Sequence, residues 1–539
     1  MQRRQLLTAA PLAWALAGCQ PRPDDMAHIG GSFTGISHER GHLLRDAAAP
    51  ATPPAASGPV RRVHTLILGA GVAGLAAARA LGQRGITDIA VLELEDSPGG
   101  NSRGGSVNGI ACPLGAHYLP VPGDDAPEVQ ALLEDLGLRQ RVAGRWVYDE
   151  RHLCHSPQER LYFNGAWQDS LLPVQGVGPA TLAQYRRFAA QVNALRQPGS
   201  RFAIPALRAP WNATHQTLDS LTFGAWLDQQ GLSDPQLRWY LDYCCRDDYG
   251  AGLNRVSAWA GLHYFASRHG FHAPSEPGVE RDAVLTWPEG NGWLTRRLAQ
   301  PLGEHLYPGR VVRRISDERH HVSVEAFHIA SQTPERWQAT QCIVALPVFV
   351  AARLVQNPPD WLTQTAAHLQ HAPWLVANLH LRAPLRDRPG AAPSWDNLIY
   401  ASTGLGYVDA QHQNLSPVPG PTVLTYYHAL GDTPEGRRHL LERPWSHWRD
   451  AILTDLSPPH PDLRALVTHI DLTRYGHAMS IPTPGLMQRL RQLTPAITRV
   501  GQPLPVPRAG RLRFAHSDWA GYSVFEEAFA RGHAAGSLL

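Results

Sequence analysis

The stretch that most limits how this chain can fold is LILGAGVAGLAAARAL, residues 66–81. Three glycines, Gly69, Gly71 and Gly74, separate an apolar run from an alanine-rich pattern with helical spacing. With the apolar run that follows, the pattern predicts a buried strand over 63–68, a helix over 72–83 and a second strand over 89–94. These elements form one βαβ unit of about thirty residues, which favours an α/β fold with a parallel sheet.

Each glycine has a structural reason in such a unit. Gly69 allows the tight turn, Gly71 lets the backbone approach a diphosphate, and Gly74 lets helix and strand pack closely. The amides of the first helical turn, which includes Ala73, and the helix dipole then face the phosphates. Glu93 lies near the end of the second strand, where its carboxylate is positioned to accept hydrogen bonds from a ribose. The stretch predicts a dinucleotide site, and both NAD and FAD satisfy it.

Composition narrows the classes of partner. The chain has 539 residues, enough for a large core and more than one domain, and a formal net charge of only +3. No basic cluster with interleaved aromatic residues is present, so we expect no nucleic-acid partner. All 49 basic residues are Arg, which excludes a Lys Schiff base, a Lys general base and a Lys phosphate clamp. The cysteines show no CxxC or Cys/His metal spacing, so no metal site is predicted.

The first nineteen residues resemble an export signal. Arg3 and Arg4 precede an apolar stretch too short to span a bilayer, and the segment ends in Leu-Ala-Gly-Cys at Cys19. This arrangement is similar to a twin-arginine signal followed by a lipobox, in which the Cys19 thiol is lipidated. It predicts export of a folded, cofactor-containing protein to the periplasmic or extracytoplasmic face of a membrane, with a lipid anchor. The alternative is a chance basic and apolar start with a stray cysteine.

Residues 20–60 form a segment rich in Pro, Ala and Gly, which predicts a tether. One piece of it, GGSFTGISHERGHLLRD at 30–46, has a more varied composition and is a candidate to pack on the folded body. We expect the globular part of the chain to begin at about residue 61.

Several later stretches carry a family resemblance. They are VLELEDSPGGNSRGG at 91–105, GIACPLGAHYLP at 109–120, WPEGNGWLTRRLAQPL at 287–302, IVALP at 343–347 and RLRFAHSDWAGYSVFEEAFARGHAAG at 511–536. Their order and their glycine patterns resemble those of the flavin amine oxidase and phytoene desaturase superfamily. The resemblance implies that the nucleotide is FAD and that the protein is an FAD-dependent oxidoreductase.

The resemblance also implies a two-domain, amine oxidase-like architecture of the α/β class. A Rossmann-type FAD-binding domain is expected from discontinuous segments, and an α+β substrate domain from the stretches between them. The implied divisions are 61–125, 276–350 and 501–539 for FAD binding, 126–275 for a mostly helical part of the substrate domain, and 351–500 for its mixed part.

Residue by residue, the resemblance implies a set of FAD contacts. Val312 is expected to grip the adenine through its backbone, Asp518 to hold the ribityl chain, and Val524 to open a helix aimed at the flavin. The implied FAD-binding residues are Gly69, Gly71, Ala73, Gly74, Glu93, Gly99, Gly100, Asn101, Ser102, Arg103, Val312, Asp518, Val524 and Phe525. Because no Cys follows Cys342, attachment through a C-terminal cysteine is excluded, and we expect non-covalent FAD.

Some positions depart from the family pattern and bear on the substrate. Asn101 replaces an Arg after the second glycine pair, and Pro113 replaces an acid before the turn back to the flavin. Val524 stands where amine oxidases often have a Tyr of an aromatic cage, a wall for which Trp519 or Tyr522 is the candidate replacement. The Lys that often positions a water near flavin N5 is absent. These departures weaken the amine hypothesis without ending it.

His117 and Tyr118 are the candidate catalytic residues, because they follow the turn back to the flavin and are expected to face its ring. Two roles are open for His117: catalysis or steering of the substrate, and a structural hydrogen bond. The stretches at 396–413 and 475–485 hold polar and aromatic groups that either line a pocket or form ordered loops.

Two pairs of acids are also present. Asp247 and Asp248 follow a helical pattern and favour a solvated helix end over recognition of a cationic amine. Glu526 and Glu527 lie in the first turn of the last helical pattern, where negative charge complements the helix dipole, and favour a structural role.

Three functions remain open from the sequence. The first is an exported, membrane-anchored FAD-dependent oxidoreductase that removes hydride from a small-molecule substrate, with an amine or polyamine as the best guess. The second is a dehydrogenase of C–C bonds that acts on a lipidic substrate. The third is a flavin-binding partner protein without turnover. The sequence leaves the electron acceptor and the oligomeric state undetermined.

Overall fold

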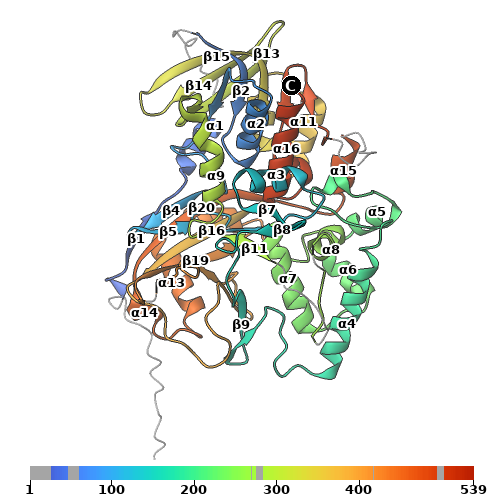
Figure 1. Cartoon of the computed structure of the whole chain (residues 1–539), viewed down its shortest axis with the longest axis vertical. Helices are drawn as coiled ribbons and strands as arrows, with labels where there is room; N and C mark the ends of the chain where they lie inside the picture. Colours follow the sequence, from blue (N-terminus) through green and yellow to red (C-terminus); the bar gives the residue numbers. More distant parts are fainter. Residues whose placement is uncertain (1–25, 47–59, 269, 275–282, 417, 494–502) are drawn as a thin grey trace, which may run out of the picture.

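The computed structural model describes residues 26–46, 60–268, 270–274, 283–416, 418–493 and 503–539. Two large sheets and a block of helices make up this part of the chain, with the first sheet in the upper half of Figure 1 and the second below it. The predicted signal and Cys19 lie outside the described residues. Within those residues no helix is both long enough and apolar enough to cross a membrane.

The first sheet is assembled from distant segments of the chain. Its strands, in spatial order, are β12 (Leu306–Tyr307), β3 (Ile89–Leu92), β2 (Val60–Leu68), β15 (Thr333–Val344), β14 (Val322–His328) and β13 (Arg310–Asp317). A short strand near the C-terminus, β22 (Leu512–Phe514), pairs in parallel with β15 and also contacts β21 (Arg508–Ala509). The helices that pack around this sheet are α2 (Val72–Gln83), α3 (Pro127–Asp135), α9 (Gly292–Ala299), α10 (Val348–Leu354), α11 (Asp360–His368) and α16 (Phe525–Ser537).

The βαβ unit forms where the glycine pattern predicted it. Helix α2 has the predicted bounds, β2 begins three residues earlier than predicted, and β3 ends two residues earlier. Gly69 adopts a φ of +95°, and a Cβ there would lie 2.6 Å from the Ala345 carbonyl oxygen. A Cβ at Gly74 would lie 1.9 Å from the Gly69 carbonyl oxygen, so only glycine lets the turn and the helix close up.

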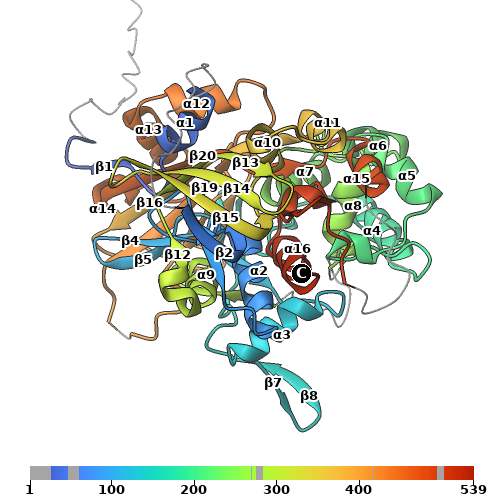
Figure 2. The ribbon, with the colours of Figure 1, turned by 90° about the horizontal axis from the view of Figure 1, so that it is seen from above.

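The last helix, α16, packs directly on α2, and the two lie side by side in Figure 1 and Figure 2. The close approach depends on two more glycines. A Cβ at Gly532 would lie 1.9 Å from the Ala73 carbonyl oxygen, and one at Gly536 would lie 2.4 Å from that of Ala77. The C-terminal segment thereby becomes part of the same domain as the first glycine-rich turn.

The second sheet is mostly antiparallel. Its order is β1 (Gly30–Phe33), β20 (Val467–Ile481), β16 (Gln370–Leu381), β19 (Thr422–Ala429), β18 (Tyr407–Asp409), β17 (Asp396–Ile399), β9 (Glu159–Phe163) and β10 (Ala166–Asp169). One core of this region joins the sheet to α12 (Gly436–Glu442), α13 (Trp445–Leu456) and α14 (Leu463–Leu466). Shorter pairings are β4 (Gly104–Val107) with β5 (Ile110–Pro113), β6 (Tyr118–Pro120) with β11 (Val284–Thr286), and β7 (Arg139–Val142) with β8 (Arg145–Tyr148).

The segment 126–275 is less helical than expected. Its helices α4 (Pro179–Ala194), α5 (Ala213–Asp219), α6 (Phe223–Gln229), α7 (Pro235–Tyr249) and α8 (Ala258–Ala266) share one large core. The same segment also contributes β7 to β10, which the sequence analysis did not predict. β9 pairs with β17, far along the chain, and β10 pairs with β9 to complete the edge of the second sheet. Tertiary pairing overrides local preference here.

Part of the predicted tether is folded. Within 20–60, residues 26–46 pack on the body, as their composition allowed. Met26 and Ile29 are buried, and β1 pairs in parallel with β20, from Gly30 opposite His469 to Phe33 opposite Leu472. α1 (His38–Asp46) follows. We call residues 26–46 the N-terminal strap.

Candidate functional site

Two glycine pairs form a trough without side chains at the end of β2. Gly71 begins α2, and the only heavy atom within 4 Å of a Cβ placed there is the Gly100 Cα, at 3.9 Å. A Cβ at Gly100, whose φ is +56°, would lie 3.2 Å from the Gly71 Cα. No side-chain group caps the amides at the start of α2. Side chains at either glycine would fill the trough, which has the form that a diphosphate needs at a helix N-terminus.

Glu93 lies beside this trough with a buried carboxylate. Its Oε2 accepts a hydrogen bond from the Ala70 amide at 2.8 Å, and its Oε1 accepts one from the Glu95 amide at 2.9 Å. Burial raises the pKa of Glu93, while these amides and the nearby Arg103 act in the opposite direction. The fixed carboxylate at the end of β3 suits the hydroxyls of a ribose.

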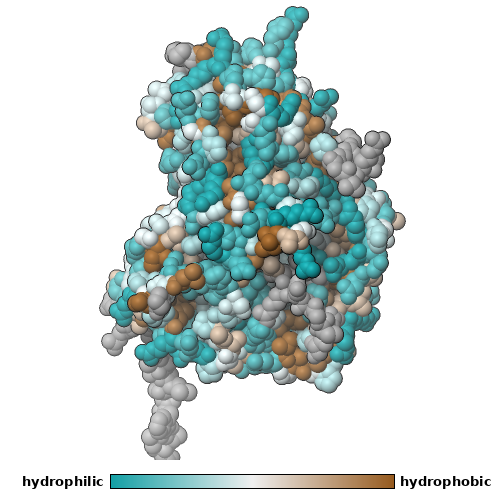
Figure 3. Space-filling view, in the orientation of Figure 1, coloured by the Kyte–Doolittle hydropathy of each residue, from teal (hydrophilic) through white to brown (hydrophobic). Residues whose placement is uncertain are grey.

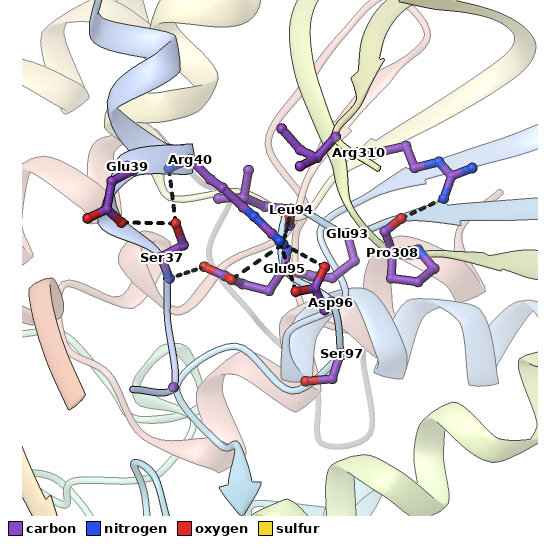
Figure 4. Close-up of polar contacts among 12 residues, drawn as sticks. Ser37, Glu39, Arg40, Glu93, Leu94, Glu95, Asp96, Ser97, Pro308 and Arg310 are labelled. Atoms are coloured by element: carbon purple, nitrogen blue, oxygen red, sulfur yellow. Dashed lines mark hydrogen bonds and ion pairs between the residues drawn. The ribbon is translucent and has the colours of Figure 1, made fainter. Parts of the chain in front are cut away.

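The N-terminal strap lies against the loop that follows Glu93 (Figure 4). The Ser37 amide donates to Glu95 Oε1 at 3.0 Å. Arg40 donates to both oxygens of Asp96, each at 2.8 Å, and to the Leu94 carbonyl oxygen at 3.3 Å. The strap therefore fixes the loop that follows Glu93.

Arg103 and Asn101, which follow the second glycine pair, bind different parts of the chain. Arg103 is buried and donates to the Ser97 carbonyl oxygen at 2.8 Å and, through Nη1, to that of Gly35 in the strap at 3.4 Å. It serves the loop and the strap. Asn101 is exposed and donates to the Ala478 carbonyl oxygen at 2.5 Å, which joins the glycine pair to β20.

The chain passes close to this glycine pair again at Gly115, where a Cβ would lie 2.1 Å from the Asn101 carbonyl oxygen. His117 follows, and its ring stacks on Tyr427 with centroids 4.4 Å apart. Trp395 and Tyr118 lie 5.4 Å and 4.9 Å from the same ring. Burial lowers the pKa of His117 to about 3, so the imidazole is neutral at physiological pH. Within the described chain it forms aromatic contacts instead of the structural hydrogen bond that the sequence offered as one alternative.

Two acids lie deep in the protein beside this aromatic group. Burial, reinforced by Asp248, raises the pKa of Asp247 to about 7, while a hydrogen bond from Tyr118 acts in the opposite direction. Burial, Asp247 and Glu159 together raise the pKa of Asp396 well above its usual range. Both residues retain some accessible surface and are otherwise enclosed by the protein.

The prediction of a solvated helix end at Asp247 and Asp248 was wrong. The end of α7 is inserted into the domain, since a Cβ at Gly250, its C-cap, would lie 2.3 Å from the Ala372 Cβ. Asp248 is buried and pairs with Arg268 at 3.0 Å. Asp247 is enclosed by the protein, as described above.

The C-terminal segment supplies anchoring contacts. Asp518 is 1 % exposed and accepts hydrogen bonds from the Val348 amide at 2.9 Å and from Ser480 Oγ at 2.5 Å. His371 Nε2 lies 3.1 Å from the same carboxylate. Burial works against ionisation, but His516 and His371 hold the pKa of Asp518 well below its usual range. Its contact with a ribityl chain stays a prediction.

Trp519 and Tyr522, the candidates for a cage wall, are both held by contacts inside the protein. Tyr522 is fully buried and donates to Glu527 Oε1 at 2.9 Å, and Glu527 also accepts from the Ala206 amide at 2.6 Å. Glu527 has the structural role that its position indicated. Trp519 packs on Trp361. Val524 caps α16 and Phe525 opens it, whereas Val312 lies in β13 at an irregularity of its pairing with β14.

The structure places Glu93 beside the glycine trough, and it places His117 and Tyr118 just after Gly115, which approaches Asn101. It adds Asp396, Trp395 and Tyr427, which were not singled out in the sequence. Of these three, only Asp396 lies in a stretch that the sequence analysis named, 396–413, for which pocket lining and an ordered loop were both open.

A glycine trough at the end of a parallel strand, with a fixed carboxylate after the next strand, is typical of a dinucleotide-binding site. The side-chain-free trough and the fixed Glu93 carboxylate fit FAD. The chain belongs to the family of flavin containing amine oxidoreductases, whose sequence model matches residues 72–536.

Individual relatives agree with this assignment. A putative flavin-containing monoamine oxidase from Mycobacterium tuberculosis is 27% identical over 310 residues, which are 57% of this chain and 61% of that protein. A putrescine oxidase from Kocuria rosea is 24% identical over 365 residues, 63% of this chain and 67% of that protein. The match to the mycobacterial protein thus covers less than two thirds of its length.

Solved structures show the same fold. A putrescine oxidase bound to putrescine aligns with a TM-score of 0.65 at 18% identity, over 89% of this chain and 99% of that chain. Cyclohexylamine oxidase from Brevibacterium oxydans aligns with a TM-score of 0.60 at 19% identity, over 88% and 98%. The architecture is therefore the two-domain amine oxidase fold that the sequence resemblance implied.

Proposed function

We propose that the protein is an FAD-dependent oxidoreductase that oxidises an amine with a second cationic group, such as a diamine or polyamine. The observation that carries the proposal is the enclosed acidic and aromatic pocket. Asp247 and Asp396 form no ion pair within the described residues, and the nearest guanidinium groups, Arg246 and Arg268, already pair with Asp242 and Asp248. Two enclosed carboxylates without a cation are costly, and a bound ammonium group offsets that cost.

The aromatic rings suit the same ligand. Tyr118, Trp395 and Tyr427 surround the neutral His117, and aromatic faces attract alkylammonium groups. Bound FAD supplies the acceptor for the hydride that leaves the substrate carbon. The reacting nitrogen enters as the free base among the rings, while the distant ammonium lies on the Asp247 side. A neutral His117 leaves the reacting amine uncharged.

The relatives support the proposal. A diamine is the substrate named for the Kocuria rosea putrescine oxidase. A lipidic substrate is the main alternative, and it calls for an apolar pocket in place of two enclosed carboxylates.

The decisive experiment is anaerobic reduction of the purified flavoprotein without residues 1–19. Putrescine and spermidine are expected to bleach the flavin absorbance at concentrations at which butylamine does not. Bleaching by polyenes alone would favour the C–C dehydrogenase. A flavin that none of these compounds reduces would favour the partner protein without turnover.

We further propose that the protein is exported by the twin-arginine-type signal and anchored through lipidated Cys19. Because Met26 is buried on the body, only the residues between Cys19 and Met26 separate a lipid from the enzyme. They reach at most about 25 Å when fully extended. Membrane fractionation of the full chain tests this, since Cys19→Ala is expected to release the protein into the soluble fraction.

A further inference from the structure

A separate cavity of about 440 Å³ lies between α12, β16 and β20. None of the residues that line it belongs to the glycine trough or to the aromatic pocket. Four of them carry basic side chains, Arg255, Arg437, His371 and His477, and no carboxylate residue lines it. This charge distribution sets the cavity apart from the acidic pocket at Asp247.

Arg437 has no acidic partner within the described part of the chain. The side chain is half-buried, and its hydrogen bonds go to backbone oxygens, from Nε to Gly476 at 2.6 Å and from Nη2 to His371 at 3.1 Å. Burial lowers the pKa of Arg437, and no carboxylate acts against this effect. These two bonds fix the direction of the guanidinium, and Nη1 has no hydrogen bond within the described part of the chain.

Arg255 contributes a second fixed positive charge in the same way. Its Nη1 donates to the Asp432 carbonyl oxygen at 3.2 Å, and its Nη2 donates to Gln370 Oε1 at 2.6 Å. Both acceptors are neutral. Two arginines with neutral acceptors around one cavity leave an unbalanced positive potential, which an anion balances.

Two histidines shape the cavity, and His477 adds no charge to it. The His477 ring packs on Phe349 with centroids 4.6 Å apart. Burial, with Arg437 and His371 nearby, lowers the pKa of His477 to about 3, so its ring stays neutral. His371 lies between the cavity and the C-terminal segment, with its Nε2 at 3.1 Å from Asp518. The cavity therefore contacts, through one ring, the carboxylate that anchors the segment before α16.

We propose that this cavity binds a small oxyanion, a phosphate ester or a carboxylic acid, between Arg437 and Arg255. Planar guanidinium groups with free donors match the paired oxygens of such anions. The volume lies within the range of about 300–1,000 Å³ found for small-molecule sites, so it also holds the organic part of the ligand. The site is distinct from the proposed amine pocket and does not depend on it.

The test uses the FAD-saturated protein, in which the diphosphate trough is filled. Inorganic phosphate and citrate are titrated by calorimetry and by thermal unfolding, against chloride at equal ionic strength. Both probes are expected to raise the melting temperature by several degrees, and chloride is expected to have little effect. Equal effects of all three salts would overturn the proposal, as would binding that occurs only in FAD-free protein.

Matched variants locate the site. Arg437→Gln is expected to weaken citrate binding at least tenfold, and Arg437→Lys is expected to retain part of it. Arg438→Gln is the control, because Arg438 is the next residue of α12 and is exposed outside the cavity. Since Arg437 also holds two carbonyl groups, Arg255→Gln provides a second variant with an expected loss in the same direction. Unchanged citrate binding in both Arg437→Gln and Arg255→Gln would show that the anion does not bind in this cavity.

Discussion

At the scale of single residues, the negative charge of Asp247 lowers the stability of the fold, although the proposed function needs that charge. Its folded-state pKa of about 7 lies above the ordinary value of 3.8. A raised carboxyl pKa means that the folded state binds the proton more tightly than the unfolded chain does. The stabilisation is complete below pH 4 and is lost as pH rises to about 7, beyond which the buried charge costs its full amount.

We expect Asp247→Asn to raise the melting temperature at pH 8 and to change it little at pH 4, because the amide carries no charge to bury. The same variant is expected to raise KM for a diamine at least tenfold above pH 7, with a smaller effect on a monoamine. Thermal unfolding across pH and steady-state kinetics measure the two effects. Asp387→Asn, at an exposed position, is the control. A variant that is less stable at pH 8 would contradict this account.

Gly71 offers a second test at the same scale, because a methyl group there enters the trough without striking any atom closer than 3.9 Å. Gly71→Ala is expected to leave the fold intact and to weaken FAD binding by about 2 kcal/mol, which is about thirtyfold. Quenching of flavin fluorescence gives the dissociation constant. Gly82→Ala on the same helix has nothing within 4 Å and is expected to bind FAD normally. It should also be more stable, by up to about 1 kcal/mol. Equal FAD affinities in the two variants would show that the trough is not the diphosphate site.

Helices and strands whose formation depends on nearby residues could be predicted from the sequence. α2 has the predicted bounds because the glycine turn before it and its alanine content act within a few residues. β9 was missed because its partner β17 lies far along the chain. β10 pairs with β9 across Asn164 and Gly165, a local hairpin signal that the sequence analysis did not use. The site divides in the same way. His117 follows the turn at Gly115, whereas Trp395 and Tyr427 reach its ring through the second sheet.

The N-terminal strap is the element with the clearest test. Arg40→Gln removes the paired contacts with Asp96 and is expected to speed FAD dissociation about fivefold, since such a partly exposed ion pair contributes about 1 kcal/mol. The rate is measured by mixing the protein with an excess of a second apoflavoprotein, which traps the FAD that dissociates. Arg238→Gln breaks an ion pair of similar exposure with Asp228, in the helical region of α6 and α7, as a control. If FAD dissociates at an unchanged rate, and the variant loses equal stability with and without FAD, the strap stabilises the fold but does not help to hold FAD.

For the whole molecule, the absence of lysine has an analytical use. The face shown in Figure 3 is mostly hydrophilic, with its hydrophobic residues in small patches, yet its positive charges are all arginine or histidine. The α-amine is then the one primary amine of the polypeptide. An amine-reactive label is expected to add once per chain at most, and fragment mass analysis locates it. A label on Cys19 in protein from the native host would agree with signal removal there, and a label on Met1 would contradict it.

The pairing of β1 with β20 also sets an order of events during synthesis. Ribosomes add about 5–20 residues per second, so Gly30 to Phe33 wait on the order of a minute before Leu472 exists to receive them. The last helix, α16, packs on α2 and is synthesised later still, so the domain of the glycine turn is completed after the strap can pair. The N-terminal strap of the chain and its last helix therefore both take their places only when nearly all of the chain has been made.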